Sequence, residues 1–474
     1  MRCKCSKTKG RPGMGRPFSF AKYYKFFGGF CKLAFSPDRS LQMISAITPT
    51  HSPEFLHDLY ESLKAQTYKN WEWVVCPNGS ATPMILAQLK AYNDPRIKVF
   101  PVPAGIGQNI GALKHYGFSM AWGDLLVEMD HDDWLHETCF EKLDNAAAGH
   151  TECFIYSHSL GLWADGNHET YSEAHGWKTK PVEYKGRTYA NPVPFPITPR
   201  SLAEIYYAPN HVRAWSRAAY AKLGGHNASL SVADDHDLMC RTYIEGILFI
   251  EIPEVLYYQR RHGRSTCIVR QPEVGRLTSQ VKDVMLHPMI FRWCKDENLE
   301  MIDLGGAHSC PKEHGFVALD VAGGKDVKYD FDVLSDEFLS KIKDDSVGCF
   351  RASDFLEHIP IGKTVELMNR LYDKLAPGGW LISATPSVVG PDGVVGRGAF
   401  QDPTHCSFYS TNNFWYFTDK QYSKYVPDIY CRFQAVTLNC VYPNQWCKDN
   451  GCPYVLADLL AIKDQRRMPG IIKI

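Results

Sequence analysis

Between residues 43 and 129, short apolar strands alternate with segments of helical periodicity, and this alternation limits the possible folds more than any other feature. The segment that begins at Pro53 places its large apolar residues three and four positions apart, the spacing of one helix face. Strands separated by helices of this length predict a mostly parallel, doubly wound sheet and an α/β fold. In such sheets ligands bind beyond the carboxyl ends of the strands. The predicted strands are residues 43–48, 71–75, 97–100 and 124–129.

An acidic cluster, Asp130-His131-Asp132-Asp133, follows directly after the fourth predicted strand. Carboxylates are ligands for hard divalent cations, and such cations bridge the oxygens of a diphosphate. The spacing of Asp130 and Asp132 lets both carboxylates approach one ion, directly or through water. The alternative is an acidic surface turn, which is common in proteins of every kind.

The chain length and the distribution of charge indicate two domains and an unusual N-terminus. A chain of 474 residues is too long for one ordinary hydrophobic core, and its formal net charge of zero gives no reason to expect a nucleic-acid partner.

Residues 1–40 carry ten Lys and Arg against the single acid Asp38. This extension is predicted to be a tail or a peripheral contact to an anionic membrane surface. The predicted boundaries are 1–40 for the extension, 41–270 for the first domain, 271–298 for a linker and 299–474 for the second domain.

Cysteine usage and hydropathy bear on the compartment. The sixteen cysteines are scattered, and Cys3-x-Cys5 lacks a second ligand pair nearby, so the pattern favours a reducing compartment over a disulfide framework or a zinc site. We find no run of about 18 apolar residues and no secretory signal pattern at the N-terminus. The sequence therefore predicts a cytoplasmic protein.

Further motifs surround the acidic cluster in a fixed order, and together they resemble the family 2 glycosyltransferases from about Ile44 to Ser265. The acidic cluster is similar to the DxD-type motif of that family, and residues 233–238 are similar to its acidic-pair motif. The resemblance implies a GT-A fold, a nucleotide-sugar donor and inversion at the anomeric carbon. Asn78 stands in a turn where aspartates that contact the base are usual, so the nucleotide stays open. The other matching segments are 47–50, 66–75, 109–114, 121–123, 156–157, 165–166, 212–215 and 257–265.

The resemblance also implies roles for individual residues. Asp130 and Asp132 would hold Mn²⁺ or Mg²⁺ on the diphosphate, and His262 either completes the metal site or is a basic loop histidine. Asp235 is the expected catalytic base that activates the acceptor hydroxyl, with Asp234 as the alternative. Both acids could instead cap a helix, because acids stabilise helix N-termini. The residues expected at the donor are Pro49, Thr50, Asn78, Asn109, Lys114, Asp130 and Arg260.

A second strand–helix pattern begins at Met301 and resembles class I S-adenosylmethionine-dependent methyltransferases over roughly residues 300–440. A strand runs into a glycine-rich turn, and later segments include Leu-Glu-His at 356–358 and Asp-Pro-Thr-His at 402–405. The resemblance implies a Rossmann-like fold and places His405 on the methyl-acceptor side. Ala307 stands where a further glycine is common, so an inactive remnant is the alternative. The residues expected at S-adenosylmethionine are Asp303, Gly305, Gly306, Asp320 and His358.

Together these patterns predict a carbohydrate-modifying enzyme with two α/β domains. The first domain is expected to transfer a sugar from a nucleotide donor to a glycan or similar hydroxyl acceptor. The second is expected to methylate a sugar hydroxyl of the product. Two alternatives remain open: a glycosyltransferase whose second domain only binds acceptor or mediates oligomerisation, and a non-catalytic glycan-binding scaffold.

Overall fold

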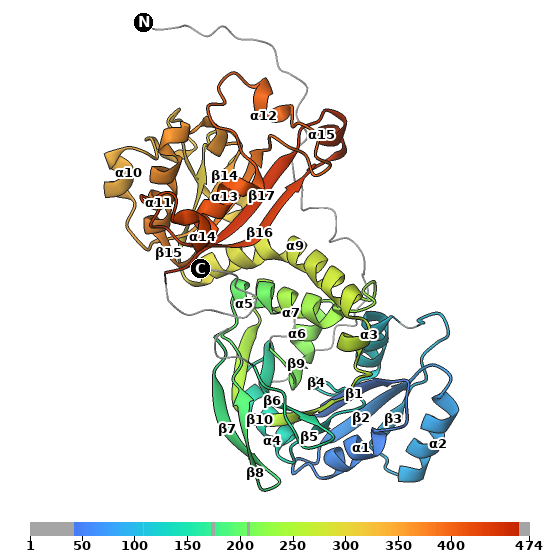
Figure 1. The fold of residues 1–474 in the computed structure, drawn as a ribbon. Helices are drawn as coiled ribbons and strands as arrows, with labels where there is room; N and C mark the ends of the chain where they lie inside the picture. The colour runs from blue at the N-terminus through green and yellow to red at the C-terminus, as the bar shows by residue number, and fades with distance from the viewer. Residues whose placement is uncertain (1–41, 108, 172–175, 206–208, 464–474) are drawn as a thin grey trace, which may run out of the picture.

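The computed structural model describes residues 42–463 except residues 108, 172–175 and 206–208. The predicted basic extension, residues 1–40, and the membrane contact predicted for it lie outside the described residues. The described part of the chain forms two α/β halves, each built around one large mixed β-sheet. The long helix α9 (Gln271–Asp296) lies between the two halves (Figure 1). The predicted α/β fold class is confirmed.

The first sheet has eight strands in the order β3-β2-β1-β4-β9-β6-β10-β5. The four strands predicted from residues 43–129 are all present, and they pair in parallel. Beyond β4 the sheet is mixed, because β9 runs antiparallel to both β4 and β6. The strands are β1 (Ile44–Thr50), β2 (Trp71–Pro77), β3 (Ile97–Val99), β4 (Leu125–Glu128), β5 (Trp134–Leu135), β6 (Cys153–Trp163), β9 (Arg213–Ser216) and β10 (Leu248–Arg261).

Apolar side chains point alternately to the two faces of the central strands, so a separate hydrophobic core forms on each face of this sheet. In β2, Trp73 and Val75 join one hydrophobic cluster, whereas Val74 and Cys76 join the other. This is the two-residue period of a strand that is buried on both faces. The helices of this domain are α1 (Leu56–Lys64), α2 (Thr82–Tyr92), α3 (Ile110–Met120), α4 (Cys139–Ala147), α5 (Pro199–Glu204), α6 (Arg217–Lys222), α7 (Asp234–Ile244) and α8 (Thr266–Val269).

The segment from about Gly161 to Pro209 is rich in Gly, Pro, Tyr and His, a composition that predicts a long loop, but it contains regular structure. Strands β7 (Thr179–Tyr184) and β8 (Arg187–Pro192) form an antiparallel hairpin, and α5 follows it. Gly186, with φ +74°, forms part of the turn between the two strands. Such a left-handed backbone conformation favours glycine. The loop expectation was wrong for these residues because a high content of Pro, Gly and polar residues is also compatible with an exposed hairpin.

The second sheet has seven strands in the order β13-β12-β11-β14-β15-β17-β16. The first five pair in parallel, and β17 runs antiparallel to both of its neighbours. The strand order reverses between β11 and β14, which is where open α/β sheets bind ligands. The strands are β11 (Glu300–Leu304), β12 (Val317–Leu319), β13 (Val327–Tyr329), β14 (Val347–Ser353), β15 (Leu375–Pro386), β16 (Phe433–Val441) and β17 (Tyr454–Ala461).

Short helices and 3₁₀ turns connect these strands. Two of them matter for the ligand-binding edge: the 3₁₀ turn η4 (Leu356–His358), which follows β14, and α12 (Gly398–Gln401), which follows β15. The others are η3 (Lys312–His314), α10 (Asp336–Lys341), η5 (Ile361–Lys363), α11 (Thr364–Lys374), α13 (Thr411–Thr418), α14 (Lys420–Ser423) and α15 (Gln445–Asp449).

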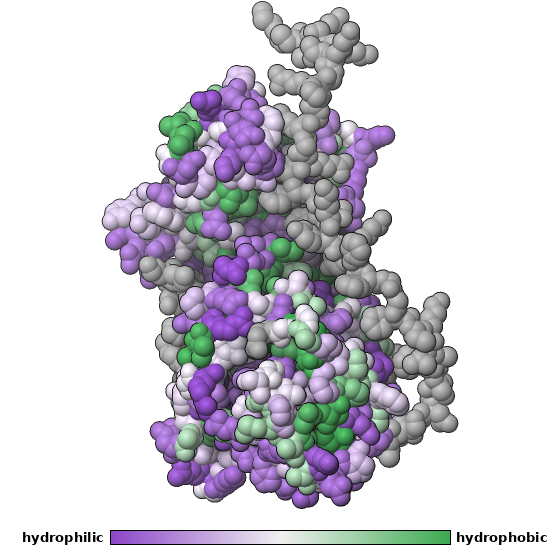
Figure 2. Space-filling view, turned by 90° about the vertical axis from the view of Figure 1, so that its right-hand side faces the viewer, coloured by the Kyte–Doolittle hydropathy of each residue, from purple (hydrophilic) through white to green (hydrophobic). Residues whose placement is uncertain are grey.

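The segment predicted as a linker, 271–298, is mostly the 26-residue helix α9. One hydrophobic cluster joins Met239 of α7, Leu286 of α9 and Trp380 of β15, so α9 packs against both halves of the chain. Exposed apolar side chains elsewhere include Trp122 and Val269. On the face shown in Figure 2, hydrophobic residues form separate patches among hydrophilic ones. Within the described ranges, we find no helix that is both long and apolar enough to cross a membrane.

Candidate functional site

A cluster of buried charges lies at the carboxyl end of β4. Glu128, the last residue of this strand, is 1% exposed and forms an ion pair with Lys114 of α3. Arg213 of β9 lies opposite Glu128 in the sheet register and is also buried. Burial would raise the pKa of Glu128, but Lys114, His211 and Arg213 outweigh it and hold the pKa well below its ordinary value. The cluster therefore keeps an ionised carboxylate inside the domain.

Asp234 and Asp235 begin helix α7 and extend this cluster. The Asp234 carboxylate is buried, with Oδ2 3.6 Å from Lys114 Nζ and 3.8 Å from His226 Nε2. Oδ2 has no hydrogen-bond partner among the residues that the structure describes. Burial raises the pKa of Asp234 to about 7 against the opposing charge of Lys114. Asp234 is thus enclosed and easily protonated.

Asp235 differs from its neighbour because it has a direct partner and access to solvent. Arg213 Nη1 donates a hydrogen bond to Asp235 Oδ2 at 2.7 Å, and the Asp235 side chain is 29% exposed. Burial would raise its pKa, but Arg213 and Lys114 outweigh burial and lower the pKa of Asp235 to about 2. An ionised and reachable carboxylate can accept a proton from a hydroxyl group.

Two of the predicted metal ligands face each other across the end of the first sheet. Asp132 follows β4, His262 follows β10, and Asp132 Oδ2 lies 2.9 Å from His262 Nε2. The Arg264 amide donates to His262 Nδ1, so Nε2 carries the proton that Asp132 accepts. A cation placed between the two side chains would take the place of that proton.

Arg260 and Asp133 hold these two strand ends together. The Arg260 amide donates to Asp133 Oδ1 at 2.8 Å, and its Nε donates to the Asp132 carbonyl at 2.9 Å. Its guanidinium also donates to Asp58 and lies 4.4 Å from the centre of the Phe55 ring. Burial, with Asp132 and Asp130 nearby, raises the pKa of Asp133 well above its ordinary value. These contacts give Arg260 and Asp133 a supporting role in the structure.

Asp130 lies with Glu128 and His211 in a second group of potential metal ligands. One ligand atom from each side chain lies within 4.8 Å of the other two. His211 Nε2 is 3.7 Å from Glu128 Oε1 and 3.8 Å from Asp130 Oδ2, and the Asp130 side chain is 44% exposed. Asp130 therefore stands at the solvent edge of the buried charge cluster, two residues before Asp132. Among the described residues, the three predicted metal ligands Asp130, Asp132 and His262 do not form one such group.

Four residues predicted at the donor lie around the ends of β1 and β2 and the start of α3. The Asn78 amide N–H and its side-chain Nδ2 both donate to the Thr50 carbonyl, at 2.9 and 3.1 Å, and Pro49 precedes Thr50 in β1. Asn109 caps α3, because its Oδ1 accepts from the Ala112 amide at 3.0 Å. Asn78 and Asn109 thus fix the backbone at the edge where a donor is expected.

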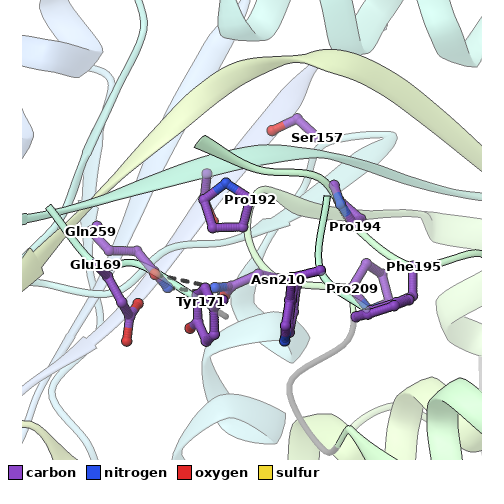
Figure 3. A pocket seen from close by; sticks show the side chains of 12 residues that line it. Ser157, Glu169, Tyr171, Pro192, Pro194, Phe195, Pro209, Asn210 and Gln259 are labelled. Atoms are coloured by element: carbon purple, nitrogen blue, oxygen red, sulfur yellow. Dashed lines mark hydrogen bonds between the residues drawn. The ribbon is translucent and has the colours of Figure 1, made fainter. Parts of the chain in front are cut away.

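A pocket opens beside this cluster, between β6, β10 and the segments that flank the β7–β8 hairpin (Figure 3). Asn210 and Gln259 exchange two hydrogen bonds, of 3.1 and 2.9 Å, at one side of it. The ring centres of Tyr171 and Trp177 lie 4.4 Å apart, and those of Trp177 and Phe195 lie 4.6 Å apart. Aromatic walls with a few polar groups are typical of small-molecule sites. The pocket meets the charge cluster at Pro209, whose carbonyl accepts a hydrogen bond from Arg213 Nε at 2.9 Å.

In the second domain, the predicted glycine-rich turn follows β11. Gly305 has φ +73°, and a Cβ on Gly306 would lie 2.6 Å from Asp303 Oδ2, so both positions favour glycine. Asp303 is 1% exposed, and its Oδ1 accepts from Arg351 at 2.7 Å. The Ala307 amide donates to Asp320 Oδ2 at 3.0 Å. The turn therefore brings four of the five residues predicted at the cofactor, Asp303, Gly305, Gly306 and Asp320, to one edge.

The fifth, His358, lies in η4, and its ring centre is 5.0 Å from that of His405, the residue predicted on the methyl-acceptor side. The two histidines come from segments almost 50 residues apart in the sequence. Both lie beyond the carboxyl ends of strands, His358 after β14 and His405 after β15.

Sequence reasoning missed three members of the first-domain cluster: Glu128, His211 and Arg213. A carboxylate at the end of an apolar strand was a usable signal for Glu128, because burying an acid is costly without partners. Arg213 stands between apolar neighbours in a segment already matched to the family, and the same argument applies to it. We find no comparable signal for His211, since its role depends on contacts with residues about 80 positions earlier.

Comparison with known proteins shows what part of the chain is similar to. Residues 45–203 match Glycosyl transferase family 2. The O-antigen biosynthesis protein RfbC of Myxococcus xanthus is 23% identical over 221 residues, which cover 46% of this chain and 16% of that protein. The putative glycosyltransferase EpsH of Bacillus subtilis (strain 168) is 26% identical over 144 residues, which cover 30% of this chain and 41% of that protein. The matches thus span less than half the length of these relatives.

Among solved structures, S. aureus TarS 1-349 is similar over 53% of this chain and 72% of that chain, with 17% identity and a TM-score of 0.38. A TM-score this low carries no conclusion. The family match ends before Asp234, Asp235 and His262, so it covers the β4 side of the cluster and not the α7 side. The similarity to Glycosyl transferase family 2 is thus confined to residues 45–203.

Proposed function

We propose that the first domain transfers a sugar from a nucleotide-diphosphate donor to a hydroxyl acceptor, with inversion at the anomeric carbon. The observation that carries this proposal is the charge cluster at the carboxyl end of β4, where His211 lies near Glu128 and Asp130, and Arg213 lies near Glu128 and Asp235. Asp132, two residues after Asp130, pairs with His262 at 2.9 Å. The family match over residues 45–203 supports the reaction class.

Asp132 and His262 would hold a divalent cation, because their carboxylate and imidazole lie 2.9 Å apart and both side chains are partly exposed, and Asp130 would be a further ligand only if its side chain turned toward them. Mn²⁺ or Mg²⁺ held there would supply positive charge for the departing nucleotide diphosphate. Carboxylate oxygens are the ligands that these ions prefer. The pocket beside Asn210 is our candidate for the acceptor, since it meets the charge cluster at Pro209 and combines aromatic walls with polar groups.

Asp235 is our choice for the base, because it is the ionised and reachable member of the acidic pair. A single carboxylate that removes the acceptor proton on the side opposite the leaving group gives inversion. Asp234 would instead balance the charge of Lys114 from within the protein.

A donor screen tests this proposal with the full chain. We expect one nucleotide sugar to raise the thermal midpoint in the presence of Mn²⁺, because a ligand selective for the folded state stabilises it. That donor should be hydrolysed slowly without acceptor, and Asp132→Ala should reduce hydrolysis at least about 100-fold. Glu137→Ala, an exposed acid outside the cluster, is the matched control. Hydrolysis that persists undiminished in Asp132→Ala would contradict the metal assignment, and donor binding without any turnover would favour the glycan-binding scaffold.

We further propose that the second domain binds S-adenosylmethionine and methylates a hydroxyl of the glycosylated product. Support comes from the strand-order reversal between β11 and β14 and from the buried Asp303 Oδ2, which has no hydrogen-bond partner among the described residues. Asp303, Gly305 and Gly306 would line the cofactor, and Asp320 would face its ribose. When bound, S-adenosylmethionine supplies an electrophilic methyl group.

Isothermal titration of the full chain with S-adenosylmethionine tests this second proposal. We expect saturable binding that Gly306→Val abolishes, because a side chain there would collide with Asp303. Gly362→Val, at a position with open space around its Cβ, is the matched control. An absence of heat with the parent chain would favour a second domain that serves acceptor binding or oligomerisation only.

A further inference from the structure

Three potential metal ligands meet at one point of the second domain. Glu357 and His358 lie in η4, His405 lies in the loop after α12, and one ligand atom of each is within 4.8 Å of the other two. His405 Nε2 is 3.9 Å from Glu357 Oε1. A tetrahedral Zn²⁺ with ligand distances of about 2.0–2.1 Å holds its ligand atoms roughly 3.3 Å apart. Small side-chain movements would therefore bring the three residues onto one ion.

Glu357 shows that this cluster is more than a chance meeting of polar side chains. The residue is 2% exposed, and neither carboxylate oxygen has a hydrogen-bond partner among the described residues. A buried acid without partners is costly unless it binds something. Its carboxylate points toward the two imidazoles.

Both histidines are held in the tautomer that a metal ligand needs. His405 Nδ1 lies 2.8 Å from the Ala399 carbonyl and can only donate to it. Thr404 Oγ1 donates to Asp402 Oδ1 at 2.6 Å, so it accepts from His358 Nδ1 at 3.2 Å. Each ring therefore leaves Nε2 with a free lone pair. Metal-binding histidines characteristically donate their other N–H to a carbonyl or to a group tied to a carboxylate.

The backbone fixes the two segments that carry these ligands. The Cys406 and Ser407 amides both donate to the Glu357 carbonyl, at 2.9 and 3.0 Å. These bonds attach the loop of His405 directly to η4. His358 is exposed, which gives an ion a path into the site and leaves a position for a further ligand.

We propose that Glu357, His358 and His405 bind one divalent transition-metal ion of the Zn²⁺ type, with an open position for water or a hydroxyl group. Two imidazoles and one carboxylate with a free position are a ligand set of catalytic zinc sites. The site is separate from Asp130, Asp132 and His262 of the first domain, and it does not depend on the glycosyl-transfer proposal.

Zinc titration of the full, chelator-stripped chain against a chromogenic chelator tests this site. The titration is repeated in an Asp130→Ala, Asp132→Ala background, which removes a ligand from each potential metal site of the first domain. We expect one tight equivalent of Zn²⁺ that survives in this background. Glu357→Gln and His358→Ala should each weaken it at least about 100-fold, since loss of supporting residues alone costs 10–100-fold. His150→Ala, an exposed histidine of the first domain, should bind like the parent.

Two features keep the test decisive. Glu357→Gln replaces the carboxyl group with an amide of similar shape, and His358 is exposed, so both variants should retain the parent's circular dichroism without metal. Thr404→Val should weaken Zn²⁺ roughly 10–100-fold while Thr404→Ser restores it, because only the hydroxyl orients His358. Equal Zn²⁺ affinity in the parent, Glu357→Gln and His358→Ala, or no binding by the folded parent, would overturn the site.

Discussion

At the scale of single residues, Asp234 and Asp235 show how adjacent acids acquire opposite properties. Asp234 is enclosed without a hydrogen-bond donor to its Oδ2 among the described residues, and burial raises its pKa to about 7. Asp235 receives a hydrogen bond from Arg213, which overcomes burial and lowers its pKa to about 2. The sequence predicted both residues but could not rank them physically, because Arg213 lies 22 positions earlier and its direction depends on the sheet.

This contrast yields a prediction for the catalytic base. We expect Asp235→Asn to keep donor binding and to reduce transfer about 10²–10⁴-fold, since the amide cannot accept the acceptor's proton. In the parent, transfer should show no loss between pH 8 and pH 5 that is due to the base, because Asp235 stays ionised far below pH 5. Steady-state transfer rates across this range, with donor affinity measured separately, check both points.

Asp234→Asn serves as the comparison for that measurement. If Asp234 were the base, its variant would lose transfer instead, and parental activity would fall as the pH drops through about 7. Either result would move the role from Asp235 to Asp234.

At the scale of elements, the site depends on how the start of α3 meets the loop before α7. The Ile110 and Gly111 amides donate to the carbonyls of Ser231 and Leu230. A Cβ on Gly111 would lie 2.2 Å from the Asn227 carbonyl oxygen and 3.1 Å from Asp234 Cβ. The sequence predicted α3 from its local periodicity. It could not predict this contact, which joins segments more than 100 residues apart.

We therefore predict that Gly111→Ala displaces the start of α7 and with it the acidic pair. The variant should lose about 2–4 kcal/mol of stability, within the range of severe steric and strain effects in buried positions, and should lose transfer activity as well. Gly105→Ala is the control, because its Cβ would meet no atom within 4 Å. Unfolding curves and transfer rates of the two variants provide the check, and parent-like behaviour of Gly111→Ala would refute the coupling.

The difference between local periodicity and contacts between distant segments explains which elements the sequence predicts. The first four strands and the helices between them follow from local apolar patterns. Strand β9 has only four residues, and its two antiparallel partners are β4 and β6, so its role in the sheet is set by distant segments. Strand β5 has two residues, too few for any periodicity to show.

At the scale of the whole molecule, the segment predicted as a linker is mostly the helix α9, and its buried side chains belong to a core that both domains share. Apolar side chains of α9 pack against α5 and α7 on one side and β14 on the other. His287 of α9 pairs with Asp458 of β17 at 2.8 Å, and Gln434 of β16 donates to Glu204 of α5 at 3.3 Å. A sequence pattern shows which residues are apolar but not that two domains will bury one helix together. The two sites are therefore held on one connected framework.

Glu204 makes this interface sensitive to pH. Burial raises its pKa from 4.5 to about 7, although Lys282 and Arg200 oppose the rise. The folded chain therefore binds this proton more tightly than the unfolded chain, so stability falls as the pH rises from about 4.5 through 7. Glu204→Gln keeps an acceptor for Gln434 but cannot ionise. We expect it to stabilise the chain by about 1–2 kcal/mol at pH 8 and to have little effect at pH 5.

Thermal unfolding of parent and variant at both pH values measures this difference. A gain of 1–2 kcal/mol corresponds to roughly 2–8 °C in the midpoint of a domain of this size. Glu245→Gln, an exposed acid beyond the end of α7, should leave the midpoint unchanged at either pH. Equal midpoints for parent and Glu204→Gln at pH 8 would show that the contact between α5 and β16 carries no ionisation cost. A gain confined to pH 8 would place a titrating group where the first domain meets the second.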